Sequence, residues 1–493
     1  MKTGFNNKKY LKLQTEKILK KVEEFNNKLY IEFGGKLFDD NHAARVLPGF
    51  DPNAKIEVLK KLSKKLEVLF VISAKDIERN KMRSDLGITY EMDVLRQIDK
   101  LTAMGITADK VVITLFEGEP AALVFKNKIE RRNLKVYVHT YTKGYPADVE
   151  TIVSDAGYGV NSYIETEKPI VVVTAPGANS GKLATCLSQI YHEYKKGIAA
   201  GYSKYETFPV WNLPLRHPVN VAYEAATANI GDINMIDSFH LEKYGITTVN
   251  YNRDLEVFPI LKTILNRIAG KDIYFSPTDM GVNMAGFTIE NDEILAHAAK
   301  DEIIRRYYYA LCEYKTGIDN EMSIKRLELL MSELGINTAF RKVTARAIEK
   351  FKQKKEISIA LELANGKIIT GRNTDIMTAG ASVLINSLKV LAKINDDIFL
   401  LMPAQLEPMQ QLKSYLYNNE ENLLNAYDVL TALSIGKATN PIAARVLSNL
   451  DKLRGCDAHS SHIIHREDND AFKNLDISLS QEPEFFSRNL YDD

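Results

Sequence analysis

Short apolar runs alternate with helical segments through the first 200 residues. The strand-like runs are mostly continuous stretches of Val, Ile, Leu and Phe, at 29–33, 67–73, 110–116, 134–140 and 169–174. Segments with helical periodicity, such as 10–25, 91–104 and 181–196, separate them. Continuous apolar strands are typical of a parallel sheet that helices cover on both faces. The sequence therefore predicts an α/β fold with a mostly parallel sheet.

Beyond residue 218 the pattern changes twice. Helical periodicity dominates from about 219 to 355, interrupted by 272–288, which predicts a strand followed by a Gly-rich loop. Near 355 a hairpin pattern begins, because apolar runs flank Asn365-Gly366, a pair that suits a type I′ turn. At roughly 150 residues per domain, we expect three parts. They are an α/β phosphate-binding domain at 1–230, a mainly helical domain at 231–354 and a smaller C-terminal α/β domain at 355–493.

The charge balance limits the classes of ligand. Lys and Arg total 64, and Asp and Glu also total 64. A formal net charge of zero argues against a general nucleic-acid or membrane-surface binder, although a local cationic pocket is compatible with it. The N-terminus lacks the apolar core of a signal peptide, and no uncharged run approaches the ~18 residues of a membrane span. Together with only three cysteines, these features predict a cytoplasmic protein with reduced thiols and no nucleic-acid or membrane partner.

One segment has the order of a phosphate-binding loop. Residues 170–190 read IVVVTAPGANSGKLATCLSQI, which is an apolar strand, a loop of small residues and a helix. In such a loop the backbone N–H groups point at an anion, and the helix N-terminus adds partial positive charge. The candidate binding residues are Gly177, Asn179, Ser180, Gly181 and Lys182.

The match to the nucleotide-binding form of this loop is incomplete. Pro176 stands at the first glycine position, Leu183 replaces the hydroxyl that would bind Mg²⁺, and Thr185 comes two residues late. The segment is therefore open to two interpretations. One is an anion site, with ATP and Mg²⁺ as candidate cofactors. The other is an ordinary strand–turn–helix joint whose Gly and Asn residues suit tight turning.

Two other loops carry cations that would meet this segment. The first predicted strand ends in a Gly-Gly-Lys turn that contains Lys36, and the second leads into Lys75, Lys81 and Arg83. Since parallel strands end at one edge of a sheet, where α/β folds bind ligands, we expect these side chains to converge on 175–182. Arg83 and Lys36 would then stabilise the charge that develops in phosphoryl transfer. The alternative is a solvated, charged loop.

Further candidates lie elsewhere in the chain. Asp279, in SPTDMGVN, is a candidate for metal or proton handling, although an ordinary turn explains it as well. Cys456, His459, His462 and His465 recur at three-residue steps. On a helix they would share a face and a metal site, whereas the neighbouring Ser and Ile pairs favour an extended segment that separates them. We assign His459 as a catalytic candidate and no residue as a metal ligand.

Four segments together resemble a known family. They are KMRSDLGITYEMDVLRQID at 81–99, VVVTAPGANSGKLATC at 171–186, SPTDMGVNMAGF at 276–287 and GCDAHSSHII at 455–464. They are similar to a family of bacterial proteins of about this length, domain of unknown function 1846, and the similarity covers the whole chain. The resemblance implies a bacterial cytoplasmic protein with an α/β first half, a helical insertion and a smaller C-terminal α/β region. It implies no activity, so no residue role is carried over.

The leading hypothesis from these residues is an ATP- or phosphate-dependent small-molecule enzyme of the kinase or ligase type. Its substrate would be an anionic small molecule, and the chain is expected to form a homo-oligomer. The first alternative is a metal- or Cys/His-dependent hydrolase or lyase that uses residues 456–465. The second is a non-catalytic nucleotide or metabolite sensor.

Overall fold

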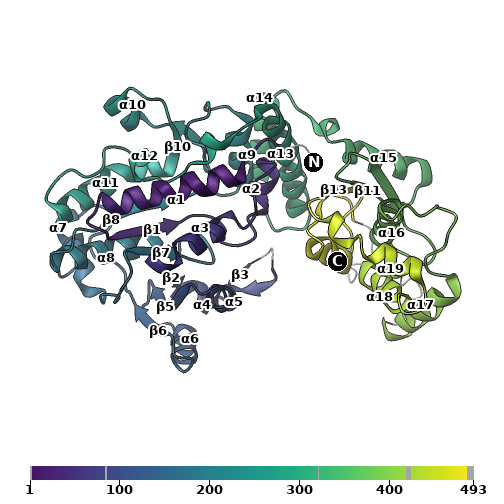
Figure 1. Cartoon of the computed structure of the whole chain (residues 1–493), viewed down its shortest axis with the longest axis horizontal. Coiled ribbons are helices and arrows are strands. Elements are labelled where there is room, and N and C mark those ends of the chain that lie inside the picture. The colour runs from purple at the N-terminus through teal and green to yellow at the C-terminus, as the bar shows by residue number, and fades with distance from the viewer. Residues whose placement is uncertain (1–2, 84–85, 320, 418–422, 486–493) are drawn as a thin grey trace. The chain divides into compact units, whose positions relative to one another are not determined.

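Six parallel strands form the larger of the two main sheets. The computed structural model describes residues 3–83, 86–319, 321–417 and 423–485 (Figure 1). The strand order is β6-β5-β2-β7-β1-β8, and every neighbouring pair runs parallel. The strands are β1 (Leu29–Phe33), β2 (Leu66–Ser73), β5 (Thr107–Thr114), β6 (Lys135–Val138), β7 (Ile170–Thr174) and β8 (Gly201–Tyr205). The predicted α/β class with a parallel sheet is confirmed.

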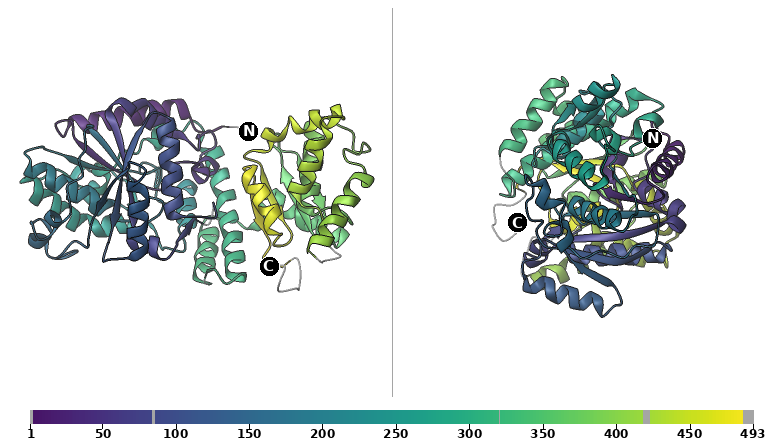
Figure 2. Two further views of the ribbon diagram at one scale, coloured as in Figure 1. Left: turned by 90° about the horizontal axis from the view of Figure 1, so that it is seen from below. Right: turned by 90° about the vertical axis from the view of Figure 1, so that its left-hand side faces the viewer.

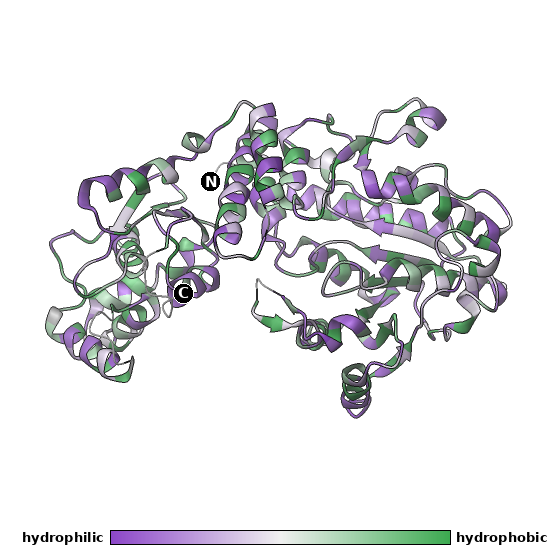
Figure 3. Ribbon diagram, turned by 180° about the vertical axis from the view of Figure 1, so that it is seen from behind, coloured by the Kyte–Doolittle hydropathy of each residue, from purple (hydrophilic) through white to green (hydrophobic). Residues whose placement is uncertain are grey.

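Burial on both faces explains why these apolar runs form strands. Every residue of β2 and of β7 is buried. Helices flank the sheet on both sides (Figure 2): α1 (Asn7–Glu23) packs on α3 (Ala54–Leu62), and α8 (Lys182–Lys195) packs on α11 (Asn252–Ala269). Hydrophobic and hydrophilic residues alternate along the helices seen in Figure 3, as one buried and one solvated face require.

Shorter elements complete this part of the chain. Two small antiparallel ladders pair β3 (Met82–Arg83) with β4 (Ile88–Thr89), and β9 (Asn234–Ile236) with β10 (Val249–Tyr251). The remaining helices are α2 (Asn41–Val46), α4 (Ala74–Glu78), α5 (Tyr90–Ala103), α6 (Pro120–Glu130), α7 (Val149–Ile152), α9 (Pro218–Ala226), α10 (Ser238–Tyr244) and α12 (Pro277–Met280).

The strand predicted at the start of 272–288 is wrong. The segment lies beside β8, an edge strand, and the backbone N–H of Tyr202 donates a hydrogen bond of 2.9 Å to the hydroxyl of Tyr274. Ser276 and Asp279 then form a capping box that begins α12. The Tyr274 hydroxyl therefore accepts the hydrogen bond from the edge strand, where the predicted strand would have offered a backbone carbonyl.

The internal contacts of the chain divide it into two units. The first contains Lys2–Glu224 and Asp232–Ala296, with the six-stranded sheet, and the second contains Ala225–Gly231 and His297–Asp493. The second unit has a four-stranded sheet of order β12-β11-β13-β14, in which only β13 and β14 are parallel. Its strands are β11 (Ser358–Glu362), β12 (Ile368–Arg372), β13 (Asp457–Ser460) and β14 (Ser478–Gln481).

Helices dominate the chain between the two sheets. α13 (Asp292–Lys315), α14 (Glu321–Glu333) and α15 (Lys342–Lys354) precede β11. The helices after β12 are α16 (Ala379–Leu391), α17 (Pro403–Tyr417), α18 (Ala426–Gly436), α19 (Pro441–Leu447) and α20 (Arg466–Asn474). The predicted helical middle region and smaller C-terminal α/β region are confirmed, while the three domain boundaries stay a prediction. No described helix combines the length and the low polarity that crossing a membrane requires.

The hairpin around Asn365-Gly366 is confirmed, but the predicted turn type is wrong. β11 and β12 pair from Ser358 opposite Arg372 to Glu362 opposite Ile368. Gly366 has a φ of +82°, whereas Asn365 has a negative φ, and the Gly366 N–H donates to the Leu363 carbonyl at 2.8 Å. A type I′ turn needs a positive φ at both central residues. The connection is instead a turn over Leu363–Gly366 that ends in a left-handed glycine.

Candidate functional site

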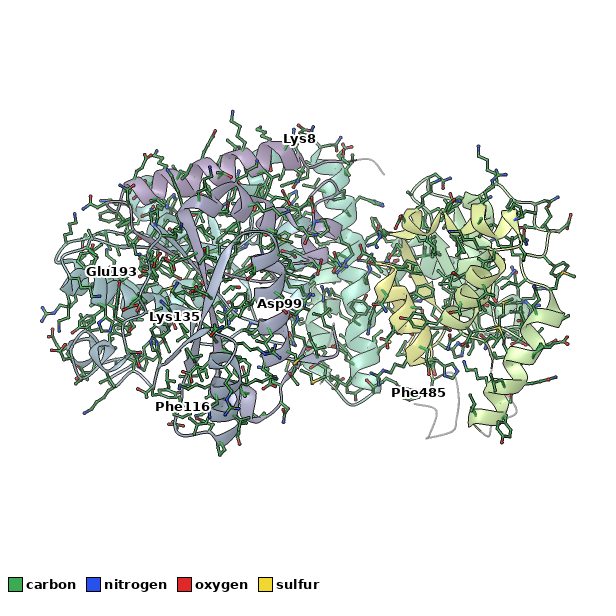
Figure 4. The ribbon with its side chains drawn as sticks, turned by 60° about the horizontal axis from the view of Figure 1, so that its bottom comes forward. Lys8, Asp99, Phe116, Lys135, Glu193 and Phe485 are labelled. Atoms are coloured by element: carbon green, nitrogen blue, oxygen red, sulfur yellow. The ribbon has the colours of Figure 1, made fainter. Side chains whose placement is uncertain are left out.

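Two neighbouring strands at the centre of the large sheet send their connections in opposite directions. β2 is followed by β5 on one side, whereas β7 is followed by β8, which lies beyond β1 on the other side. In open α/β sheets, ligands bind outside the carboxyl ends of the strands at such a switch point. In Figure 4 the label of Phe116, just past the carboxyl end of β5, marks the carboxyl edge of the sheet. The label of Lys135, at the amino end of β6, marks the opposite edge. The loop between β7 and α8 lies at the carboxyl edge, at this switch point.

The strand, loop and helix order that the sequence predicts for 170–190 is present. β7 ends at Thr174 and α8 begins at Lys182. Asn179 and Gly181 have φ values of 57° and 86°, so the chain turns twice through the left-handed region before the helix. The buried Ser180 Oγ donates to the Gly177 carbonyl at 2.8 Å and closes the loop on itself.

The backbone of this loop presents unpaired donors. None of the N–H groups from Gly177 to Leu183 donates a hydrogen bond to another described residue. The loop is accessible, since Ala178 and Asn179 are exposed. The Lys182 side chain folds back so that its Nζ lies 3.5 Å from the Gly177 carbonyl oxygen. A phosphate group is typically bound by free N–H groups at a helix N-terminus together with a nearby lysine.

Two residues outside the loop hold it in place, and sequence patterns did not single out either of them. Thr114, the last residue of β5, donates from Oγ1 to the Ser180 carbonyl at 2.7 Å. Gly177 lies against Tyr90, the first residue of α5, so closely that an added Cβ would sit 2.4 Å from the Tyr90 hydroxyl oxygen. Glycine is therefore required at 177 by packing, whereas the left-handed φ requires it at Gly181.

The loop does not fit a magnesium ion held as in nucleotide-binding loops. Leu183 has no oxygen to offer, and Thr185 donates its hydroxyl to the Gly181 carbonyl at 3.0 Å while being almost fully buried. In the standard loop a Ser or Thr directly after the lysine binds Mg²⁺. The groups that this loop offers to a ligand are therefore its N–H donors and one lysine, without a hydroxyl that is free for a metal ion.

The predicted convergence of cations on the loop is realised in part. Lys81 lies with its Nζ 5.0 Å from the centroid of the Tyr90 ring, the ring that packs on Gly177, and it pairs with Asp76 at 3.3 Å. Lys75 instead forms an ion pair of 3.1 Å with Glu117, beyond the end of β5. Lys81 is thus the predicted cation that the described contacts bring nearest to the loop.

Arg83 is held by a carboxylate. Its Nη1 lies 2.7 Å from Oδ2 of Asp93, a residue of α5 that is fully buried. Arg96 donates two hydrogen bonds to Oδ1 of Asp93, and Gln97 donates one to Oδ2. This arrangement fixes β3 and β4 to α5, so Arg83 has a structural partner at the position where we expected it to meet a ligand.

A buried lysine supports the turn that contains Lys36. Lys55 is 2% exposed, and its Nζ donates to the carbonyls of Gly34 and Lys36 and to Oδ2 of Asp40, each at 3.1 Å. Burial by itself raises the pKa of Asp40, but Lys55, His42 and the Ala43 N–H together more than offset this, so the pKa is lowered. Lys36 itself is exposed on the turn. A sequence signal for Lys55 exists, because it shares a helix face with Leu59 four residues later.

A cavity of about 350 Å³ in the first unit has no lining residue in common with the loop. Asp279 lines it, together with His240 and Tyr244 of α10. The Asp279 Oδ2 accepts hydrogen bonds from the N–H groups of Phe275 and Ser276 and from the Tyr244 hydroxyl, at 3.0 to 3.1 Å. The residue predicted to handle a metal or a proton therefore holds the start of α12 and lies apart from the phosphate-loop candidates in the fold.

His459 lies in the second unit, fully buried on β13. Its Nδ1 is 2.9 Å from the Ser480 hydroxyl, its Nε2 is 3.2 Å from a carboxylate oxygen of Glu482, and its ring packs on Tyr308. Burial lowers the pKa of His459, and the hydrogen bond to Glu482 offsets part of that effect. The imidazole is thus a fully partnered group of the sheet.

The other members of the C-terminal cluster are separated from one another. Cys456 is buried, with its Sγ 3.7 Å from the Lys452 carbonyl, and burial raises the pKa of its thiol to about 11. His462 packs on Phe351, and His465 is the N-cap residue of α20. No group of three or more His, Cys, Asp or Glu side chains that could hold a metal ion occurs in the described part of the chain. The extended arrangement is the one observed, and it separates the four side chains.

Comparison with known proteins covers both units. Residues 3–335 match domain of unknown function DUF1846, N-terminal, and residues 339–491 match domain of unknown function DUF1846, C-terminal. The chain belongs to the DUF1846 family. The resemblance seen in the sequence motifs is therefore confirmed.

Close relatives of this DUF1846 chain span its full length. A UPF0371 protein of Clostridium botulinum (strain Alaska E43 / Type E3) is 54% identical over 500 residues, which are 100% of this chain and 99% of the relative. A UPF0371 protein of Clostridioides difficile (strain 630) is 54% identical over 100% of both chains. One of Fusobacterium nucleatum is 53% identical over 504 residues, 100% of this chain and 99% of the relative. The DUF1846 family is one of unknown function, so membership brings no substrate or reaction with it.

Proposed function

We propose that this DUF1846 chain is an enzyme that binds the phosphate group of a small phosphorylated molecule on the loop 175–182. The observation that carries the proposal is the row of N–H groups from Gly177 to Leu183, which have no acceptor among the described residues. An unpaired N–H is costly when it is removed from water, so an exposed row of them at one helix N-terminus favours an anion.

The charges around the loop support a phosphate ester as the ligand. Lys182 neutralises one phosphate oxygen, and Lys81, next to Tyr90, is a second cation at the same edge. The Tyr90 hydroxyl, beside Gly177, is a donor for the remainder of the ligand. Since Leu183 provides no metal ligand, the favoured ligand is a phosphate ester bound without a loop-held Mg²⁺, ahead of the ATP–Mg²⁺ complex.

The topology supports catalysis over passive binding. The loop lies at a switch point of the sheet, where the ends of several strands supply groups to one ligand. Phosphoryl chemistry depends mainly on positioning and on charge stabilisation, and a preorganised loop with a lysine provides both. A sensor would use the same loop for binding and would show no turnover.

Ligand-induced stabilisation tests the proposal. The purified protein is heated with inorganic phosphate, a panel of sugar phosphates, and ATP with and without Mg²⁺. A ligand that binds only the folded state raises the melting temperature by mass action. We expect a rise with a phosphate ester that is lost in Lys182→Ala and kept in Lys8→Ala, which removes an exposed lysine of α1 (Figure 4).

Three outcomes of this experiment decide between phosphate binding by the loop, an ATP-dependent enzyme and a sensor. No response to any phosphate compound, or an equal response in Lys182→Ala, contradicts phosphate binding by the loop. A response to ATP that requires Mg²⁺ favours a kinase or ligase over a metal-free phosphate ester site. Binding without consumption of any ligand in the panel favours the sensor.

A further inference from the structure

The cavity that Asp279 lines has one wall made by α1. Lys17 and Lys21 lie four residues apart on this helix, so both reach the cavity from the same helix face. Lys21 is engaged, because its Nζ donates to the Asp279 carbonyl at 2.9 Å and pairs with Glu24 at 3.2 Å. Lys17 forms no hydrogen bond or ion pair with any described residue. Burial and the nearby Lys21 lower the pKa of Lys17, and the carboxylates of Glu24 and Asp279 offset part of that effect.

A histidine on α10 provides a second available group. His240 is 9% exposed, and its Nδ1 lies 2.8 Å from the Ser276 hydroxyl. Its Nε2 has no hydrogen-bond partner within the part of the chain that the structure describes. The hydrogen bond at Nδ1 orients the ring, so that the other nitrogen is held in place for a ligand.

The two carboxylates that line the cavity, Glu24 and Asp279, have partners of their own, and Asp279 Oδ1 lies 3.7 Å from Nδ1 of His240. The Asp279 carboxylate accepts three hydrogen bonds on one oxygen, and Glu24 pairs with Lys21. Two further lysines, Lys243 and Lys262, lie with their Nζ atoms 4.1 and 5.5 Å from the centroid of the Phe275 ring, which also lines the cavity. Lys17 is therefore the lining lysine that has no ion pair with a described residue, and Lys243 and Lys262 add positive charge next to the cavity.

Three aromatic side chains form another part of the wall. Trp211, Tyr244 and Phe275 all line the cavity. The Trp211 indole N–H donates to the Asn283 carbonyl at 2.7 Å, and its ring contacts Phe287 edge-on. The ring is thus fixed in orientation, and fixed aromatic faces bind flat groups with little loss of conformational entropy.

We infer that this cavity is a second ligand site, for a small planar organic anion. Its carboxylate or phosphate group binds Lys17 and His240, and its ring packs against Trp211 and Phe275. A volume of about 350 Å³ is within the range of small-molecule sites. The inference is independent of the phosphate loop, because the two sites have no residue in common.

Trp211 makes the site directly observable, since it is the one tryptophan of the sequence. Its fluorescence is followed while the full-length protein is titrated with phenyl phosphate, benzoate, benzamide and inorganic phosphate. We expect a saturable change with phenyl phosphate or benzoate and none with neutral benzamide. The stronger of the two anions identifies the ligand as a phosphate ester or a carboxylate. No saturable change with either anion up to about 10 mM, a Kd range in which binding is below ~3 kcal/mol, overturns the inference.

Matched variants separate this site from the loop. Lys17→Gln is expected to weaken binding of the aromatic anion roughly tenfold or more, because a charge-assisted hydrogen bond is lost. Lys17→Arg keeps most of the affinity. Lys12→Gln, which removes a surface lysine of the same helix that is 73% exposed, and Lys182→Ala, in the loop, leave the titration unchanged. Unaltered binding in Lys17→Gln, or equal binding of inorganic phosphate and phenyl phosphate, contradicts the assignment of the site to Lys17 and the aromatic wall.

Discussion

Thr114 at the end of β5 donates a hydrogen bond of 2.7 Å to the carbonyl of Ser180, 66 positions later in the chain. Both residues are buried, and the bond crosses the carboxyl end of β2, which separates β5 from β7 in the sheet. One hydroxyl therefore ties the loop to the carboxyl end of β5, across the switch point.

Replacement of Thr114 tests this contact. Thr114→Val keeps the shape and removes the donor, so the buried Ser180 carbonyl loses its partner at a cost of about 1–3 kcal/mol in the free energy of unfolding. The same variant is expected to weaken phosphate binding. Urea denaturation and the thermal-shift panel measure the two effects. Thr114→Ser, which keeps the hydroxyl, serves as the control, and a Val variant as stable as wild type would show that the bond contributes little.

The contact between Gly177 and Tyr90 predicts a double-mutant cycle. In Gly177→Ala the new Cβ would lie 2.4 Å from the Tyr90 hydroxyl oxygen, so the ring or the loop must move. We expect a loss of about 1–3 kcal/mol in stability and a loss of phosphate binding. Tyr90→Ala in the same chain removes the clash and is expected to recover most of the stability. Additive effects of the two changes would argue that the loop does not rest on this ring.

The ion pair between Lys55 and Asp40 predicts a large difference between two lysines of one helix. Lys55→Met leaves Asp40 and two carbonyls without their buried donor, and we expect a cost of about 3–5 kcal/mol. Lys60→Met removes an exposed partner of Glu57, with side chains 41% and 39% exposed, and is expected to cost less than about 0.5 kcal/mol. Chemical denaturation of both variants checks the contrast, and similar costs would contradict the buried role of Lys55.

A buried carboxyl predicts a pH dependence of the second unit. Burial raises the pKa of Asp468 from 3.8 to about 6, although the residue accepts a hydrogen bond of 2.7 Å from the Ala426 N–H at the start of α18. Because the folded pKa lies above the unfolded one, the native state binds the extra proton between these values. Stability therefore falls as pH rises from about 4 to about 6, by on the order of 2 kcal/mol from this group.

Asp468→Asn isolates that effect. The amide keeps the acceptor for Ala426 and cannot ionise, so the fall in stability between pH 4 and pH 6 is expected to flatten relative to wild type. Urea midpoints measured across this range provide the comparison. Identical pH profiles of the two proteins would show that Asp468 ionises in the folded state as readily as in the unfolded one.

Much of the fold follows from patterns of neighbouring residues. The apolar run at 170–174 predicts β7, and the small residues before Lys182 predict the loop and the start of α8. Such features depend on residues a few positions apart, so they can be predicted from the sequence without the tertiary structure. The strand expected near 272 fails for the opposite reason, because the hydroxyl of Tyr274 is bonded to the distant Tyr202.

The candidate cations also show what the sequence predicts and what it leaves open. Charge and position indicate Lys36, Lys75, Lys81 and Arg83 equally well, yet Arg83 pairs with Asp93 and Lys75 with Glu117. Which cation meets a ligand depends on the carboxylates that the fold places beside each one, and those partners follow no periodicity in the sequence.

The sequence by itself determined the α/β class, the order of the main strands and helices from β1 to α8, and the strand–loop–helix segment at 170–190, because each depends on local periodicity and turn chemistry. Only the tertiary structure decided that β7 lies between β1 and β2, that Thr114 and Tyr90 support the loop, and that Lys17 and His240 line one cavity. These relationships join residues tens to hundreds of positions apart. They arise from the packing of buried surfaces, which is a property of the whole folded chain and of no single segment.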